Sequence, residues 1–431
     1  MKQLAHGENN VLNLTKGPRY WFTLISKFLI GQGGIQAINI ICGVLILRYL
    51  SIEEYALYTI ASSLFVIGSI GSDFGLAQGV NTLGAKLVED SAKLGILYAS
   101  AYRYRKILYP LAMTAVLVVS VYVIYGRSWS ILNIGLVICT IFLSIWYQQS
   151  LALKKSILNV YHDSNGLFKA GLAESVTRLM AISTCIFFPY AIVALSVNFF
   201  GIIVSHYVLV KRCSRFIKLD EAPNYMQSTQ LKKFVMPLAP ALIYYMVQGQ
   251  ISVVLLGLYG MTAAVAEVGA LGRLGQVVGL LIMLNSFIIL PHFSRISEKK
   301  SYLNHFKVII FILSILCLIG MTSAYLIPNW WLAVLGKKYS GLASNLPMAV
   351  LGPFLTLVGA TLYSMVIARN ETNGQSWYIF LGLASQIIFI FLFDVKSTQS
   401  ALLLNMLPAI AYICVQGILI RRLLVNWCSK K

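Results

Sequence analysis

Six charged side chains lie within long apolar segments of this 431-residue chain, and five of them, all except Glu267 near the start of its segment, are the first candidates for chemistry. A buried cation there could bind phosphate, and a guanidinium can pair with two phosphate oxygens at once. A buried carboxylate could bind a proton, a sodium ion or a cationic ligand. A charge that faces lipid costs about 2.5–3.5 kcal/mol at the centre of a membrane helix, so each should face the protein interior. The five residues are Lys27, Asp73, Glu174, Arg178 and Arg273.

Arg273 is the foremost candidate for binding an anionic substrate. It lies nine residues past the start of an apolar segment at residue 264, about 13 Å deep at 1.5 Å per residue of helix. The alternative is a structural pair with Glu267 or a backbone carbonyl, although residues six apart on one helix are poorly placed for a direct pair. We predict that Arg273 faces a polar path through the protein.

The two other cations each have a structural explanation beside the functional one. Arg178 lies about 12 Å into its segment, and Glu174 precedes it by four residues, the favoured order for an ion pair on one helix face. The two could neutralise each other, or Arg178 could bind substrate and Glu174 a coupling ion. Lys27 lies near the inner end of the first segment, where it could reach toward lipid headgroups or first contact an anionic substrate headgroup.

Asp73 lies toward the cytoplasmic end of the second segment, between Gly71 and Gly75. The two glycines could let another helix approach closely. The carboxylate could bond to the end of a neighbouring helix, or it could be a proton or sodium site. Both interpretations stay open at the level of the sequence.

Uncharged polar side chains also recur at helical spacing within the segments. Residues three or four apart share a helix face, and such side chains could line a sugar-binding cavity or join helices at about 0.6–2 kcal/mol per bond. They are Gln32, Gln36 and Asn39 in the first segment and Tyr244 and Gln248 in the seventh. Pro237 and Pro240 precede the second group and predict a kink or local unwinding.

These residues must be positioned by membrane-spanning helices. The chain is 58% hydrophobic and only 11% charged, against about 25% charged in soluble domains, and about 20 apolar residues span a bilayer as a helix. The predicted spans are 22–47, 55–79, 107–126, 130–152, 170–189, 191–210, 235–259, 264–291, 308–327, 346–368, 377–393 and 400–420.

The basic residues sort to one side of the predicted spans. Loops rich in Lys and Arg stay in the cytoplasm, and with the N-terminus inside, most of the 34 Lys and Arg residues fall on that side. The outside loops hold only Arg48, Arg127, Lys337, Lys338 and Lys396. We therefore expect both termini in the cytoplasm, and we attribute the net charge of +20 to topology rather than to nucleic-acid binding. No removable signal peptide is expected in the polar residues 1–21.

A polar interval divides the spans into two sets of six. An even number of spans returns the chain to the same face, which is the plan of a parallel repeat. We expect an all-α integral membrane protein with about twelve transmembrane helices in two six-helix bundles. The predicted parts are a cytoplasmic segment 1–21, a bundle 22–210, a linker 211–234, a bundle 235–420 and a cytoplasmic tail 421–431.

Three short segments carry a resemblance to a known family. Residues 53–58 read Glu-Glu-Tyr-Ala-Leu-Tyr and residues 72–76 read Ser-Asp-Phe-Gly-Leu. The eighth span ends with Leu290-Pro291-His292-Phe293-Ser294-Arg295. With the six-plus-six plan, this resembles the Wzx-type polysaccharide-unit flippases of the multidrug/oligosaccharidyl-lipid/polysaccharide (MOP) exporter superfamily, although the family usually has Gly where this chain has Ala56.

The resemblance implies a transporter with a central cavity between two bundles. Its expected substrate is an undecaprenyl-pyrophosphate-linked oligosaccharide, moved from the inner to the outer leaflet of a bacterial plasma membrane by alternating access. The implied pathway is the synthesis of O-antigen or a related surface polysaccharide. Membrane lipids, a polysaccharide polymerase and a chain-length regulator are the partners that it implies.

Several other functions lack their motifs. No phosphate-binding loop of the G-x-x-x-x-G-K-[ST] type occurs, the five histidines have no metal-ligand spacing, and no C-x-x-C occurs. We therefore expect no cofactor, no metal and no enzyme activity. A membrane polysaccharide polymerase is an alternative, but the longest outside loop, 328–345, has no carboxylate for catalysis. An ion-coupled multidrug exporter of the same superfamily is a second alternative and would favour buried carboxylates.

Overall fold

The computed structural model describes residues 29–124, 130–296, 298–369, 371 and 373–427. Within these ranges the secondary structure is helical and includes no strand. Eleven helices there are long and apolar enough to cross a membrane. A further apolar helix, α17 (Trp377–Leu392), has 16 residues. The all-α membrane fold expected from the sequence is confirmed.

The bounds of the helices set the frame for the site. The long helices are α2 (Gly34–Tyr49), α3 (Ile52–Asp73), α5 (Ser91–Ile124), α6 (Ile131–Val160), α7 (Ser164–Ala181), α9 (Ala191–Cys213), α10 (Tyr225–Val247), α12 (Thr262–Leu284), α14 (Lys299–Leu326), α16 (Leu346–Ile367) and α18 (Thr398–Val425). The shorter ones are η1 (Leu29–Gly33), α4 (Leu76–Gly84), α8 (Thr184–Phe187), η2 (Gln248–Gln250), α11 (Ile251–Leu258), η3 (Asn285–Ile289), α13 (Leu290–Arg295), α15 (Pro328–Leu335) and η4 (Lys337–Ser344).

Polar side chains define where several helices begin. Ser51 accepts a hydrogen bond from the backbone N–H of Glu54 at the start of α3, 3.2 Å away. Ser130 and Asp163 do the same for α6 and α7, and Ser397 forms a capping box at α18. Such side chains satisfy backbone donors that have no partner within the helix.

Several predicted spans, among them the second, seventh and eighth, contain interruptions that the apolar pattern does not reveal. The second is broken after α3, where Phe74 and Gly75 have φ of 49° and 85° before α4 begins. In the seventh, α10 continues through both prolines, and the change of helix type comes later, at η2. Of the two alternatives expected there, a kink or local unwinding, unwinding at the prolines is therefore wrong, because the helix continues past them. In the eighth, the π-helix η3 follows α12.

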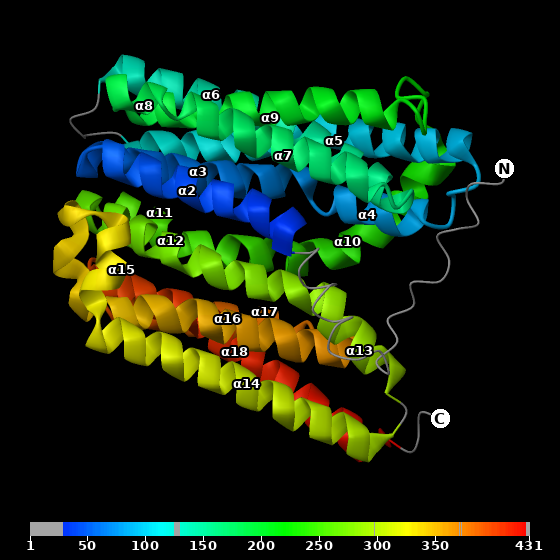
Figure 1. Cartoon of the computed structure of the whole chain (residues 1–431). Helices are drawn as coiled ribbons and strands as arrows, with labels where there is room; N and C mark the ends of the chain where they lie inside the picture. The colour runs from blue at the N-terminus through cyan, green and yellow to red at the C-terminus, as the bar shows by residue number, and fades with distance from the viewer. Residues whose placement is uncertain (1–28, 125–129, 297, 370, 372, 428–431) are drawn as a thin grey trace.

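The helices form two groups along the chain. Helices α2 to α9 pack chiefly with one another, as do α11 to α18, and Figure 1 shows them in two halves of the molecule. The halves meet mainly where α12 packs on α3 and α2. Helix α10 crosses between them, because it packs against α4 and α5. We call the end with α15 and η4 the outer end, following the predicted topology, and the opposite end the inner end.

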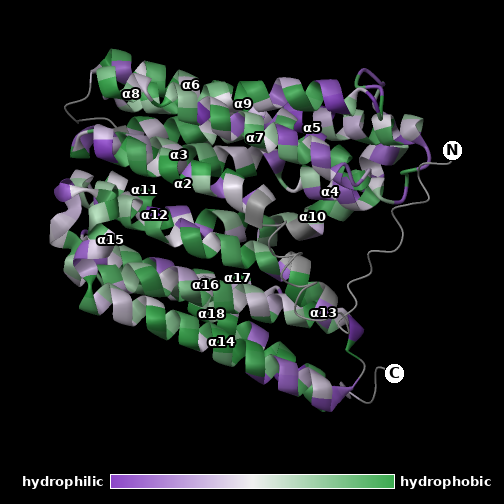
Figure 2. Cartoon of the chain, in the orientation of Figure 1, coloured by the Kyte–Doolittle hydropathy of each residue, from purple (hydrophilic) through white to green (hydrophobic). Residues whose placement is uncertain are grey.

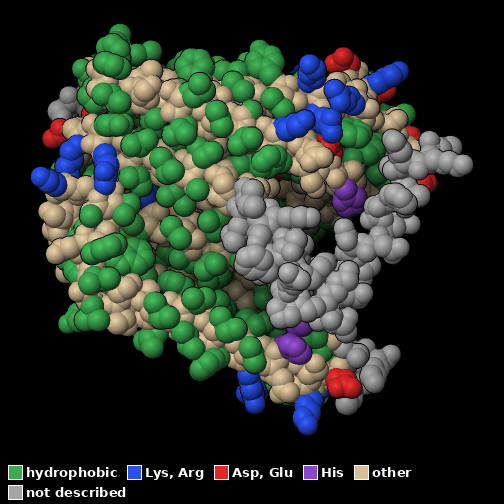
Figure 3. Space-filling model, in the orientation of Figure 1, with side chains coloured by type: hydrophobic (Ala, Val, Ile, Leu, Met, Phe, Trp, Pro, Cys, Tyr) green, Lys and Arg blue, Asp and Glu red, His purple; other side chains and the backbone are tan. Residues whose placement is uncertain are grey.

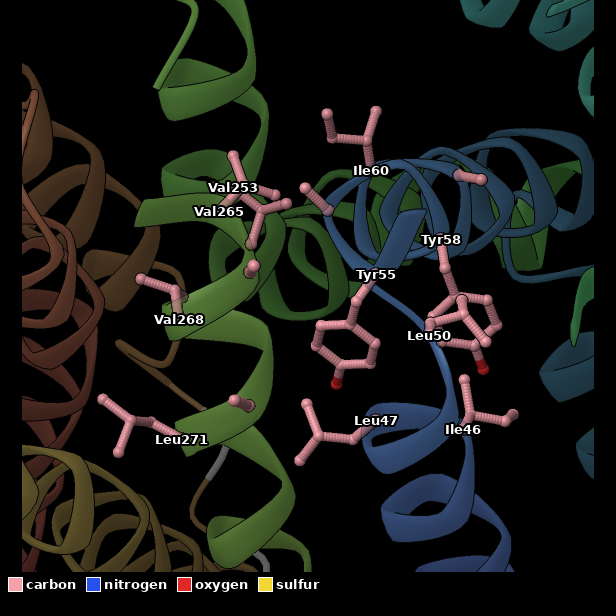
Figure 4. Close-up of a cluster of buried hydrophobic side chains, with 14 of the residues drawn as sticks. Ile46, Leu47, Leu50, Tyr55, Tyr58, Ile60, Val253, Val265, Val268 and Leu271 are labelled. Atoms are coloured by element: carbon pink, nitrogen blue, oxygen red, sulfur yellow. The ribbon is translucent and has the colours of Figure 1, made fainter. Parts of the chain in front are cut away.

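The buried apolar core joins the halves at the outer end only. One cluster there combines side chains of α2 and α3 with those of α11 and α12, and Figure 4 shows Tyr55 and Leu47 in the space between α2, α3 and the helix that carries Val265, Val268 and Leu271. Toward the inner end, two further clusters are separate: one belongs to the N-terminal half with part of α10, and the other to the C-terminal half. The described structure is thus closed at the outer end.

The surface has the character of a membrane protein. Figure 2 shows hydrophobic residues along the middle of the long helices and hydrophilic residues toward their ends. On the face seen in Figure 3, Lys and Arg gather near the two ends, with apolar side chains between them. Large exposed apolar side chains such as Phe311, Leu318 and Phe391 are expected to contact lipid. Length, composition and surface together describe a multi-pass membrane protein.

Candidate functional site

Two adjoining cavities lie between the packed helices. The first, of about 400 Å³, is lined from α2, α3, α6, α7, α9 and α12. The second, also of about 400 Å³, is lined mainly from α3, α12, α16 and α18. Three residues line both cavities, namely Ser62, Arg273 and Gln276. The site therefore spans the contact between the two halves of the protein.

Arg273 lies where the two cavities meet. Its Nε donates a hydrogen bond to the Tyr55 hydroxyl across 3.2 Å, and its guanidinium carbon is 5.8 Å from the centroid of the Tyr58 ring. Neither Glu267 nor any other described carboxylate forms an ion pair with it. Tyrosines of α3 thus hold the guanidinium of Arg273 against that helix. Its terminal N–H groups can donate hydrogen bonds to an anionic partner.

A hydrogen-bonded link carries this contact into the N-terminal half. Asn198 of α9 donates to the Tyr58 hydroxyl at 3.0 Å. Gly43 of α2 gives the guanidinium room, because a Cβ at that position would lie 3.0 Å from Nη1 of Arg273. Sequence reasoning missed Tyr58 and Asn198 as site residues, since only the packing of α3, α9 and α12 brings them together.

Arg178 lines the first cavity together with Arg273. Its Nη2 donates to Glu174 Oε1 at 2.7 Å, so the pair predicted from the spacing forms. Gly201 of α9 allows the close approach of Arg178, because a Cβ there would be 2.8 Å from Cγ of the arginine. Glu174 is not among the residues lining either cavity. Arg178 is therefore a cation in the cavity wall whose charge is largely balanced by its own helix.

The predicted polar face of the first span reaches the cavity in part. Gln36 and Asn39 line it, and Asn39 Oδ1 accepts a hydrogen bond from Ser175 Oγ at 3.2 Å. Gln32 is exposed and does not line the two cavities. Lys27 lies outside the described residues. Of the described residues on this helix face, Gln32 near the inner end is therefore the one that lines neither cavity.

Tyr244 and Gln248 lie elsewhere, in contact with α17. The Tyr244 hydroxyl donates to Gln386 Oε1 at 3.2 Å, and the Tyr378 hydroxyl donates to Gln248 Oε1 at 2.6 Å. Neither residue lines the two cavities. Their contacts support the alternative stated above, in which the polar groups join helices.

Asp73 closes the break between α3 and α4. Its Oδ1 accepts a hydrogen bond from the backbone N–H of Ala77 at 3.2 Å, in the first turn of α4. A carboxylate at the N-terminus of a helix satisfies free backbone donors and complements the helix dipole. Asp73 does not line the two cavities, so its contacts match the helix-end interpretation.

The charge of the two cavities has one sign. The lining sets include Arg178 and Arg273 but no Asp or Glu among the described residues. Gln276 adds an amide to both cavities. It lies three residues after Arg273 on the same helix face, so the helical spacing could have predicted that it joins the site. No group of three described metal-ligating side chains occurs. The arrangement suits an anion with sugar-like hydroxyls more than a cation.

Two basic side chains fasten the outer end. Arg48 at the end of α2 donates to the carbonyls of Val334 and Ala333 at the end of α15, at 3.1 and 2.5 Å. Lys338 donates back to the carbonyls of Arg48 and Leu50, at 3.2 and 2.7 Å. Each cation thus caps a helix end of the other half, where carbonyls lack partners and the dipole favours positive charge.

Lys338→Gln is expected to open the outer end more often. Two hydrogen bonds are lost, each worth about 0.5–1.5 kcal/mol, so the open fraction should rise at least about fivefold. A cysteine placed at Gly272, which lines the second cavity and has open space at its Cβ position, would report this through its rate of reaction with a maleimide added outside, once the seven native cysteines are replaced. The control is Lys337→Gln, which removes a neighbouring charge. An unchanged rate in Lys338→Gln would mean that these bonds do not hold the end closed.

Comparison with solved structures identifies proteins of similar fold. No family model matches the sequence, and no curated protein matches it. An inward-facing multidrug resistance MATE family transporter of the MOP superfamily is similar in structure, with a TM-score of 0.65, 15% identity, and coverage of 90% of this chain and 95% of that one. The lipid II flippase MurJ in an inward closed conformation gives 0.64 at 14% identity, covering 93% and 89%.

A third solved structure is also similar in fold. It is a MOP superfamily transporter from Pyrococcus furiosus, described as having a binding pocket of reverse polarity that suggests a different function; its TM-score is 0.51 at 12% identity, with 93% and 94% covered. All three are transport proteins. This chain therefore has the all-helical membrane fold of the MOP superfamily transporters.

Proposed function

We propose that this protein is a flippase for undecaprenyl-pyrophosphate-linked oligosaccharide units in the synthesis of a surface polysaccharide such as O-antigen. It moves the unit from the inner to the outer leaflet of a bacterial plasma membrane, with both termini in the cytoplasm. The observation that carries the proposal is Arg273, a cation without a carboxylate partner in the described structure, at the junction of two cavities. The structural likeness to the lipid II flippase MurJ supports a lipid-linked substrate.

The chemistry of the substrate sets what the site must supply. The polyprenyl tail can stay in the bilayer, but pyrophosphate and sugars need a polar path. Arg273 and Arg178 line one cavity and provide guanidinium groups for phosphate oxygens. Gln36, Asn39 and Gln276 in the same wall provide amides for sugar hydroxyls. Cations and amides thus lie within one continuous lining.

The closed outer end supports transport by alternating access. The shared core at the outer end and the separate cores toward the inner end match one of the two states that such a cycle needs. A pyrophosphate bound by Arg273 would compete with Tyr55 for the guanidinium and so weaken a contact between α12 and α3. Binding would then shift the balance of states through contacts that differ between them.

A multidrug exporter is the second candidate, because MATE transporters share the fold. An exporter of cationic drugs needs a carboxylate in its cavity. In the described cavity walls no Asp or Glu is present, and the nearby Glu174 is paired with Arg178. A polysaccharide polymerase and a chain-length regulator stay proposed partners of the flippase.

A binding experiment separates the two candidates. Purified protein is titrated with undecaprenyl pyrophosphate, with undecaprenol as the uncharged control and with tetraphenylphosphonium as the cationic probe. We expect thermal stabilisation by the pyrophosphate alone, weakened at least tenfold in Arg273→Gln and unchanged in Arg103→Gln, an exposed arginine of α5. Stabilisation by tetraphenylphosphonium and none by the pyrophosphate would favour the drug exporter.

A further inference from the structure

A second group of cations lies inside the N-terminal half, apart from both cavities. Arg105 of α5, Gln149 and Lys154 of α6, and His206 of α9 form what we call the buried cation layer. The first three side chains are only 2%, 1% and 4% exposed. None of the four lines the two cavities. The layer is therefore a separate polar site enclosed by the helix bundle.

Hydrogen bonds hold the layer in two groups that meet at neighbouring residues of α6. Arg105 Nε donates to Gln149 Oε1, and its Nη2 donates to the Trp146 carbonyl at 2.5 Å. The next residue after Gln149 is Ser150, whose hydroxyl accepts from Lys154 Nζ at 2.5 Å. The two cations are thus linked through adjacent residues of one helix.

The histidine completes the layer and reveals its tautomer. His206 Nε2 lies 3.3 Å from Lys154 Nζ and 3.0 Å from Ser150 Oγ. An ammonium can only donate, so Nε2 accepts and the ring proton lies on Nδ1. That Nδ1 is buried without a hydrogen-bond partner.

Each unsatisfied atom of the layer lacks an acceptor. Besides Nδ1 of His206, these atoms are Nη1 of Arg105 and Nε2 of Gln149, which are also buried without a partner. All three are N–H donors. Buried donors in native proteins are almost always paired, so this concentration of free donors indicates a missing acceptor.

The charge of the layer indicates what kind of acceptor is missing. Neither Arg105 nor Lys154 forms an ion pair with a described carboxylate. Asp73 acts on Arg105 through its charge, but it bonds to α4. The centroid of the Tyr98 ring lies 5.9 Å from Lys154 Nζ, and that of the Tyr102 ring lies 5.3 Å from Cζ of Arg105. These cation–π contacts offset part of the cost of burying the two charges. A net positive charge is left in a low-dielectric interior.

We propose that the buried cation layer binds a small inorganic anion of halide size. An anion supplies the missing acceptor and balances the charge, whereas a water molecule supplies only the first. The near-complete burial of Arg105, Gln149 and Lys154 excludes a lipid phosphate. The bound anion joins α5 and α6 through Arg105 and Gln149, so it stabilises the N-terminal bundle without entering the substrate path.

Halide exchange on the purified full-length protein tests the proposal. The unfolding temperature is measured in sodium chloride, sodium bromide and sodium gluconate at equal ionic strength, gluconate being too large to enter. We expect the wild type to lose several degrees in gluconate and Lys154→Met to show no halide dependence. Arg103→Gln, an exposed change two residues from Arg105, is expected to behave as the wild type does.

A crystal grown in bromide gives a test that needs no variant. The expected result is an anomalous peak within hydrogen-bond distance of Arg105 Nη1 and Gln149 Nε2, two of the donors without a partner. Equal unfolding temperatures in chloride and gluconate, with only water density at the layer, would overturn the proposal. A halide effect that persists unchanged in Lys154→Met would overturn it as well, because the anion would then bind elsewhere.

Discussion

Arg273→Gln is expected to abolish translocation of lipid-linked oligosaccharide while the protein still inserts and folds. The change removes the cation at the junction of the two cavities and keeps a side chain that can donate to Tyr55. Loss of one partner of a buried charge-assisted contact costs about 2–5 kcal/mol, so the rate should fall at least about 30-fold. The measurement is transfer of a fluorescent undecaprenyl-pyrophosphate-linked oligosaccharide across proteoliposomes.

Two further variants separate charge from geometry. Arg273→Lys keeps the charge but not the planar fork that holds two phosphate oxygens, so it should retain a reduced rate between those of the wild type and Arg273→Gln. Arg103→Gln removes an exposed cation of α5 and should leave the rate unchanged. Transport by Arg273→Gln at the wild-type rate would exclude Arg273 from the substrate path.

A disulfide between positions 59 and 269 is expected to stop transport by holding the outer end closed. Thr59 of α3 and Gly269 of α12 face each other across the contact between the halves, and a Cβ at 269 would lie 3.2 Å from the Thr59 Cβ. Disulfides prefer a Cβ–Cβ distance of about 3.8 Å, so a shift of a few tenths of an ångström allows the bond. Oxidation of Thr59→Cys/Gly269→Cys should reduce transport by roughly 90% or more, because the disulfide prevents α3 and α12 from separating.

The disulfide can be reduced again, which provides a control within the same experiment. It requires replacement of the seven native cysteines, and the two single-cysteine variants serve as controls for the substitutions. Dithiothreitol should restore transport in the double variant and change nothing in the single ones. A cross-linked protein that transports at the rate of the reduced one would mean that the outer end need not open.

The sequence predicted the fold well because the membrane imposes a strong local rule. Apolar segments of sufficient length are recognised without tertiary information. The interruptions were missed for the same reason. Phe74 and Gly75 break α3 from α4 within the predicted span 55–79, and η2 follows α10 beyond Pro237 and Pro240.

The candidate site was predictable where one residue carried the signal. A charge deep in a span must find a polar environment, and the structure places Arg273 and Arg178 in the wall of one cavity. The Arg178–Glu174 pair also followed from local spacing. The positions of these residues could be predicted from the helical repeat and the membrane environment alone.

The remainder depends on which helix faces which, and spacing alone does not encode that. Tyr244 and Gln248 have the same periodicity as the first span's polar face, yet they bond to α17. Tyr58 and Asn198 join the site only through packing of α3, α9 and α12. Arg105 lay just before a predicted span and was counted as a cytoplasmic charge, whereas α5 extends past it.

The most direct test of the proposed flippase is the sidedness of lipid-linked oligosaccharide in cells depleted of this protein. We expect unpolymerised carrier to accumulate in the inner leaflet, to return to normal when the wild type is expressed again, and to persist with Arg273→Gln. Carrier that reaches the outer leaflet normally in depleted cells would contradict the proposal. With defective chain growth that result would indicate a polymerase, and with no change in glycan it would favour the drug exporter.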